Sequence, residues 1–150
     1  MRRDSRLSVA LHALLHMSDH AGVLTSEVLA TMLHTNAVVV RRTMGRLREA
    51  GLVRSEKGHG GGWSLARALD AMTVGDVYAA IGSSTIFSIG VRDERPGCLV
   101  EQAVNRALGH ALGEAEALLV NQLRSVSVAE VLADARAHHA RSPKGSAGRG

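Results

Sequence analysis

The sequence predicts a mainly α-helical chain with a small β wing, in which a winged helix-turn-helix head precedes a long dimerisation helix. Residues 25–65 contain, in order, a short helix, a tight turn, an arginine-bearing second helix and a glycine-filled hairpin. This is the element order of a winged helix-turn-helix. Alanine and larger apolar residues recur at helical spacing over residues 98–124. With one Trp, one Tyr and one Phe in the chain, the core must consist of Leu, Val, Ala and Met, which favours closely packed helices.

The helices of the head are predicted from apolar spacing and from end signals. An apolar stripe at helical spacing indicates a first helix over Ser5–Ser18. The stripe consists of Leu7, Leu11, Leu14 and Leu15. Thr25 is a suitable N-cap for the next helix, and Glu27 in its first turn suits the helix dipole. The turn His34–Asn36 then leads into the second helix of the motif, which should end at a left-handed cap, Gly51.

The second helix of the motif carries the residues that we expect to contact DNA. Its inward face consists of Val40, Met44 and Leu47. Two valines on the outward face suit the methyl groups of thymine. Arg41 and Arg42 are the candidates for base edges or adjacent phosphates, whereas Arg46 should position the DNA backbone. The expected DNA contacts from this region are Asn36, Val38, Val39, Arg41, Arg42 and Arg46.

Two short strands, Leu52–Glu56 and Trp63–Ala66, are predicted to form the wing. Four of the five residues 58–62 are glycine, so the backbone can approach a ligand closely. Taken alone, this hairpin tip could be flexible and without a ligand. Directly after a helix-turn-helix it predicts a wing that touches DNA. The expected wing contacts are Lys57, Gly58, His59, Gly60 and Gly61. A nucleotide-binding loop is disfavoured, because no strand–glycine loop–helix unit surrounds the glycines and no GK[ST] follows them.

Charge is distributed unevenly along the chain. Residues 35–67 carry seven Arg or Lys against two Glu, a net of +5, while residues 68–140 carry five basic against nine acidic residues, a net of −4. The chain's overall charge of +4 is therefore an average. This polarity suits a protein that presents one face to phosphate.

The second half is predicted to begin with a short helix, to about Ile81, that Thr73 and Asp76 cap. A loop, with the option of a short strand at Ile86–Ile89, leads to a helix over Cys98–Arg124. An alanine row allows two helix backbones to approach closely. The predicted seam consists of Ala103, Ala107, Leu108, Ala111, Leu112 and Ala115. Its partner could be the first helix of the same chain, but a second copy is favoured because the head is too small to cover it.

A further capping box at Ser127 and Glu130 opens a last helix to about His138. The chain then divides into a DNA-binding head at residues 1–81, a loop at 82–97, dimerisation helices at 98–140 and a disordered basic tail at 141–150.

Five segments together resemble the Rrf-two family of bacterial winged-helix regulators over residues 5–135. They are RLREAGLV, KGHGGGW followed by SL, MTVGDVYAAI, the pair Cys98-Leu99 and SVAEVL. The resemblance implies a transcriptional regulator, here expected to be a repressor. It also implies a homodimer whose long helices cross-pack and whose two heads bind an inverted repeat in double-stranded DNA. In cluster-binding members, three cysteines lie in the loop and at the start of the long helix.

This chain departs from that cysteine pattern. Its one cysteine, Cys98, occupies what resembles the last of the three positions. The loop offers Ser83, Ser84, Ser88 and Asp93 instead, which are poor ligands for an iron–sulfur cluster. We therefore expect a clusterless branch with no cofactor. Cys98 next to Arg95 at a helix N-terminus is a candidate thiol sensor, and the alternative is a small buried apolar residue.

Other functions are less well supported. His12, His16 and His20 are spaced at four residues, but without a cysteine or carboxylate companion they predict no metal site. No nucleophile, metalloprotease or P-loop motif is present, so an enzyme is not expected. A winged helix that binds only protein is an alternative, but it needs no arginine-rich helix. Control by a small molecule or a partner protein stays open. A single cysteine and the lack of a long apolar run predict a cytoplasmic protein with no membrane segment.

Overall fold

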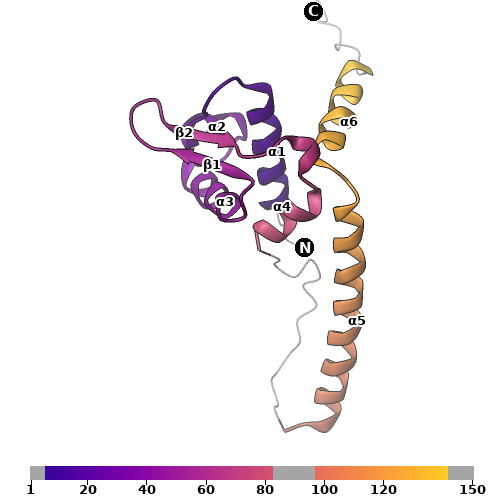
Figure 1. Ribbon diagram of the computed structural model, residues 1–150. Coiled ribbons are helices and arrows are strands. Elements are labelled where there is room, and N and C mark those ends of the chain that lie inside the picture. The colour runs from indigo at the N-terminus through magenta and orange to yellow at the C-terminus, as the bar shows by residue number, and fades with distance from the viewer. Residues whose placement is uncertain (1–5, 83–96, 142–150) are drawn as a thin grey trace, which may run out of the picture.

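A computed structural model describes residues 6–82 and 97–141 of the chain. Figure 1 shows a head of short helices and a β hairpin, from which one long helix extends. The head contains α1 (Arg6–Asp19), α2 (Ser26–Met32), α3 (Ala37–Glu49), β1 (Val53–Glu56), β2 (Gly62–Leu65), the 3₁₀ turn η1 (Leu69–Ala71) and α4 (Val74–Ala80). The remaining elements are α5 (Leu99–Arg124) and α6 (Val128–Arg141). The predicted fold class, mainly α with a two-stranded wing, is confirmed.

The core of the head is aliphatic. Its largest fully buried side chains are Leu14, Leu29, Val40, Met44, Leu47, Leu52, Val53, Met72, Val77 and Val128. Eight of them come from α1, α2, α3, β1, α4 and α6, while Leu52 precedes β1 and Met72 precedes α4, so the hairpin and the helices share one core. In α1 the buried face is centred on Ala10, Leu14 and Met17, while Leu7, Leu11 and Leu15 are only partly buried. Of the predicted leucine stripe, Leu14 thus lies in the centre of the buried face and the other three leucines lie at its edge, because small alanines allow the closest approach to the other helices.

The predicted helix caps are present. The Thr25 hydroxyl accepts a hydrogen bond from the Val28 amide at 3.2 Å. Thr73 and Asp76 form a reciprocal capping box at the start of α4. Ser127 and Glu130 do the same for α6, with the Glu130 amide donating to the Ser127 hydroxyl at 3.1 Å. Each cap satisfies backbone groups that the first helical turn leaves unpaired.

The long helix α5 contacts the head near its own C-terminal end, and its N-terminal end extends away from the head (Figure 1). Close to the head it packs on α4, where a Cβ atom on Gly75 would lie 2.4 Å from the Arg124 side chain. The Tyr78 hydroxyl donates to Glu116 Oε1 at 3.4 Å on the same side. None of the 26 residues of α5 is buried. Most of this helix therefore has no cover within the described residues.

The last helix returns to the head. The Val74 amide donates to the Val126 carbonyl at 2.9 Å, and the Val128 amide donates to the Met72 carbonyl at 2.8 Å. Val128 is fully buried. The sequence grouped residues 98–140 as dimerisation helices, whereas the first turn of α6 completes the core of its own head. That α5 forms the dimer stays a prediction.

Several expectations concern residues outside the described ranges. They include the optional strand Ile86–Ile89, the loop side chains Ser83, Ser84, Ser88, Asp93 and Arg95, and residues 142–150. Residue 141, assigned to the tail, is the last residue of α6. Among residues 6–82 and 97–141, no helix is both long and apolar enough to span a bilayer.

Candidate DNA-binding interface

Helix α3 is sharply two-sided. Val40, Met44 and Leu47 are buried in the core. Val38 is 59% exposed, Arg41 and Arg42 are exposed, and Val39 is half-buried. The burial of one face fixes which side chains the other face presents. This face has the composition of a helix that enters a DNA groove, with cations beside apolar groups.

Asn36 begins α3. Its side-chain oxygen accepts a hydrogen bond from the Val39 amide at 2.9 Å. The preceding turn contains His34 in a left-handed conformation, with φ of 51°. The sequence proposed Asn36 as a DNA contact, and its observed contact is with the helix itself. This cap was not among the predictions from the sequence, although Asn is among the preferred N-cap residues.

The three arginines of α3 have different surroundings. Arg41 forms an ion pair with Glu27 in the first turn of α2. Arg46 donates a hydrogen bond to the Ile81 carbonyl, so it ties α3 to the end of α4. Within the described part of the chain, Arg42 has no hydrogen bond or ion pair and extends into solvent. Arg42 is therefore the most available cation on the exposed face of α3, whereas Arg46 has a contact within the head.

One of the basic residues counted between residues 35 and 67, Arg67, forms hydrogen bonds within the head. The Arg67 guanidinium donates to the carbonyls of Ala50 and Gly51, both at 3.3 Å. Gly51 has a φ of 73° and ends α3 as predicted. A cation on the last carbonyls of a helix complements its dipole. From the sequence, Arg67 was only counted in the net charge of residues 35–67, because no nearby residue indicates its contact with the end of α3.

The wing is an antiparallel hairpin in which Val53 pairs with Leu65 and Glu56 pairs with Gly62. Its tip requires glycine. Gly58 and Gly60 have φ values of 95° and 75°, and a Cβ atom on Gly61 would lie 2.3 Å from the Glu56 carbonyl oxygen. The Gly61 amide donates to the Gly58 carbonyl at 3.0 Å, so this predicted phosphate donor is already engaged within the hairpin.

The base of the wing is joined to the helix-turn-helix. Leu24 and Trp63 exchange two backbone hydrogen bonds, of 3.0 and 2.8 Å. The Trp63 indole N–H donates to the Ser26 hydroxyl at 2.9 Å. A Cβ atom on Gly62 would lie 2.6 Å from the Leu24 carbonyl oxygen. Figure 1 shows the hairpin projecting from the head beside α2 and α3, and these contacts hold it there. Trp63 is a positioning residue that the sequence treated only as part of a motif.

A notch separates the helix-turn-helix from the wing. It has a volume of about 290 Å³ and is lined by Glu27 and Arg41 on one side and by Ser55, Glu56 and Gly61 on the other. Two carboxylates and one guanidinium thus lie in the space between the two elements expected to contact DNA.

The predicted sensor and the predicted seam lie on α5. Cys98 is the N-cap residue of α5, half-buried and not in a disulfide. Of the seam, Ala103, Ala107 and Ala111 are exposed. The remaining seam residues, Leu108, Leu112 and Ala115, are half-buried. The residues of α5 that contact α4 include Glu116 and Arg124, and Glu116 lies one helical turn beyond the seam residue Leu112.

The fold and this exposed surface define a winged helix-turn-helix protein of the DNA-binding class. The sequence pattern of the Rrf2 family, described as an iron-dependent transcriptional regulator, matches residues 3–134. The chain belongs to this family, and it is a DNA-binding transcriptional regulator and not an enzyme. The alternative of a head that binds only protein is therefore not retained.

Individual relatives agree with this assignment. A protein of Bacillus subtilis (strain 168) described as the HTH-type transcriptional regulator YwnA is 29% identical over 131 residues, which cover 86% of this chain and 96% of the relative. YffB of Lactococcus lactis, described in the same terms, is 34% identical over 110 residues, covering 72% of this chain and 70% of the relative. A crystal structure of a protein described as a transcriptional regulator from Lactobacillus plantarum has a TM-score of 0.77 at 25% identity, and covers 91% of this chain and 93% of that one.

The donor set does not fit an iron–sulfur cluster, which is the form of iron that the cluster-binding members of the family hold. The whole sequence contains one cysteine, whereas clusters of the common types use four ligands, mostly thiolates. Among residues 6–82 and 97–141, no group of three His, Cys, Asp or Glu side chains could hold a metal ion. This includes the histidine row at His12, His16 and His20.

Proposed function

We propose that this regulator binds an inverted-repeat operator as a homodimer and represses transcription in the cytoplasm by occupying promoter DNA. The observation that carries the proposal is the exposed face of α3, where Val38, Arg41 and Arg42 lie beside a glycine-rich wing. In this arrangement α3 enters a major groove, while Lys57 and the amides of Gly58, His59 and Gly60 approach the flanking phosphates.

The uncovered surface of α5 supports dimerisation. Its first turn exposes Leu99 by 78% and Val100 by 71%, and Val104 and Leu118 are also largely exposed. The helix is about 39 Å long at 1.5 Å per residue. Large apolar side chains exposed along one helix indicate an interaction site. A second α5 is the proposed partner, with the seam at Ala103, Ala107, Leu108, Ala111, Leu112 and Ala115.

The experiment that tests the proposal is selection of bound sequences from a random DNA library by the full chain. We expect an imperfect palindrome with half-sites about one helical turn, roughly 34 Å, apart. Transcription in vitro from a promoter that contains the selected site should fall when the protein is added. Selection of a single asymmetric site would contradict the dimeric mode, and a rise in transcription would contradict repression.

We further propose that the regulator works without a cluster, and that Cys98 is its candidate signal receiver. Cys98 is the N-cap residue of α5, has a free thiol and is half-buried, so a reagent can reach part of its side chain. Oxidation to sulfenic acid or to a mixed disulfide would enlarge the side chain where α5 begins. Because α5 is the proposed dimer helix, such an adduct would act on the separation of the two heads.

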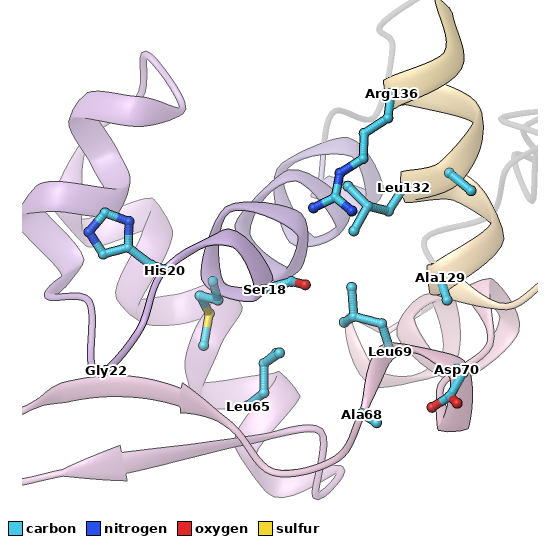
Figure 2. Close-up of a pocket in the computed structure, with 12 residues that line it drawn as sticks. Ser18, His20, Gly22, Leu65, Ala68, Leu69, Asp70, Ala129, Leu132 and Arg136 are labelled. Carbon is cyan, nitrogen blue, oxygen red and sulfur yellow. The ribbon is translucent and has the colours of Figure 1, made fainter.

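A specific feature favours a second mode of control, by a small molecule. A cavity of about 650 Å³ lies between the end of α1, η1 and the first turns of α6. Figure 2 shows Arg136 reaching from α6 toward the end of α1, with Leu69 close to α6 and Leu65 farther from it. The volume falls in the range of ligand sites, and apolar side chains with a few polar groups are their usual lining. Protection of α1 and α6 from hydrogen exchange by a cellular metabolite extract would support this mode, and protection confined to the Cys98 region would favour the thiol.

A further inference from the structure

We propose that Glu27 is a specificity-determining residue, because it holds Arg41 and so withholds this cation from DNA of the wrong sequence. The inference rests on the proposed use of α3 as the groove-binding helix. It concerns a residue that lies outside α3 and outside the wing tip.

The geometry begins with two neighbouring helices. Glu27 lies in the first turn of α2, whose start is fixed by the Thr25 cap. Arg41 lies near the middle of α3 and forms an ion pair with Glu27. The Glu27 side chain is 62% exposed and the Arg41 side chain is 54% exposed. The pair is therefore on the surface and accessible to DNA, so it is not a buried element of the core.

The position of the pair gives it a role in binding. It lines the notch between the helix-turn-helix and the wing, where Glu56 contributes a second carboxylate. A DNA strand that contacts both α3 and the wing must pass this notch. A carboxylate there repels phosphate, and the nearest cation that could offset the repulsion, Arg41, is already paired. Arg42, in contrast, has no partner among the described residues.

The ion pair between Glu27 and Arg41 should affect binding to non-specific DNA and binding to the operator differently. Non-specific binding depends on the number of phosphates that lysines and arginines neutralise. With Arg41 held by Glu27, the protein neutralises about one phosphate fewer. On the operator, Arg41 can instead donate two hydrogen bonds to a guanine while Glu27 still orients the guanidinium from behind. Glu27 therefore weakens non-specific binding more than operator binding, which raises the ratio of the two.

The test measures the affinity of the full-length protein for a random duplex and for the selected operator across a range of salt concentrations. For Glu27→Gln, we expect random-duplex affinity to rise roughly fivefold, the size of effect that an exposed ion pair can supply. The plot of log affinity against log salt should become steeper by about 0.9, because the freed Arg41 neutralises one more phosphate. Operator affinity should change less, so the specificity ratio falls.

Two controls show whether Glu27 acts through Arg41. Glu49→Gln removes an exposed carboxylate from the last residue of α3 and should leave the salt slope unchanged. In an Arg41→Ala background, Glu27→Gln should no longer steepen the slope. Library selection with Glu27→Gln and with Arg41→Ala should relax the same base position. An unchanged melting temperature for Glu27→Gln excludes a folding defect.

The possible failures are distinguishable. If wild type binds DNA and Glu27→Gln gives the wild-type slope and specificity ratio, the role of Glu27 is wrong and the proposed function stands. The role of Glu27 is also wrong if the double variant gains as much slope as the single one, because the effect would then bypass Arg41. If wild type shows no salt-dependent binding, both proposals fail.

Discussion

The indole N–H of Trp63 donates a hydrogen bond to the hydroxyl of Ser26 at 2.9 Å, and this bond joins the wing to the first turn of α2. Within residues 6–82 and 97–141, Ser26 is one of two buried polar residues. The two parts of the DNA-binding surface are thus held together by a side chain from each, in addition to the backbone bridge between Leu24 and Trp63.

Replacing Ser26 with Ala should therefore loosen the wing. The variant leaves the Trp63 N–H without its acceptor, and loss of one hydrogen bond typically costs about 1 kcal/mol. We expect this decrease in the free energy of unfolding in urea titrations, together with weaker operator binding. Ser64→Ala, which changes the neighbouring residue of β2, should have little effect on either quantity. Equal effects of the two variants would argue against a special role for the Trp63 bond.

Removal of the Arg42 side chain should weaken DNA binding directly. Arg42→Ala should cost about 1–3 kcal/mol of operator binding if the guanidinium makes a bidentate contact with guanine. Fluorescence anisotropy with a labelled operator measures this loss. Arg106→Ala, which removes an exposed cation from α5, serves as the control. If Arg42→Ala left specific and non-specific affinity unchanged, the assignment of α3 to the groove would be wrong.

Enlarging a side chain in the proposed seam should disrupt the dimer. Ala107→Leu or Ala111→Leu overpacks two helices in close contact, at a typical cost of about 1–3 kcal/mol. Sedimentation should show more monomer, and operator affinity should fall in parallel. Arg106 lies about five helical turns before Arg124 on the same face of α5, so Arg106→Leu should leave the dimer intact. If Ala107→Leu and Ala111→Leu both left the dimer unchanged, the dimer interface would have to lie on another face of α5.

The single cysteine leads to two predictions, one about bound iron and one about the response of operator binding to oxidants. Protein purified without oxygen should carry no iron and no visible absorbance, because two thiols in a dimer cannot replace four ligands. If Cys98 is the sensor, diamide or peroxide should alter operator affinity in wild type but not in Cys98→Ser. Bound iron in stoichiometric amounts would refute the first statement, and identical responses of the two proteins would refute the second.

Acid should loosen the start of α6. The backbone amide of Ser127, and secondarily its hydroxyl, hold the pKa of Glu130 below its ordinary value of 4.5. Because this pKa is lower in the folded state, the capping box is stable above about pH 4.5 and is lost as pH falls through the folded pKa. The protection of the amides of residues 128–131, measured as their exchange rate relative to the intrinsic rate at each pH, should decrease there. Glu130→Gln should show faster exchange already at neutral pH and a weaker dependence on acid.

Local signals predicted much of this structure. Thr25, Thr73, Asp76 and Gly51 act within a few residues of their own positions, so spacing alone identified the ends of the helices. Contacts between distant segments had no such signal. Nothing near Arg46 indicates the Ile81 carbonyl, and nothing near Arg67 indicates the end of α3, because both contacts depend on how the helices pack. A long arginine looks the same in the sequence whether it binds phosphate or a carbonyl of its own fold.

Gly75 and Arg124 form a close contact where the C-terminal end of α5 meets the head. A tilt of α5 relative to the head would turn about this contact. A lever about 39 Å long magnifies any tilt at this point, and roughly 10° of rotation would displace its far tip by about 7 Å. In a dimer built on α5, the same rotation would alter the distance between the two copies of α3. The half-site spacing that such a dimer accepts would then depend on Gly75, where a glycine in place of alanine leaves room for Arg124.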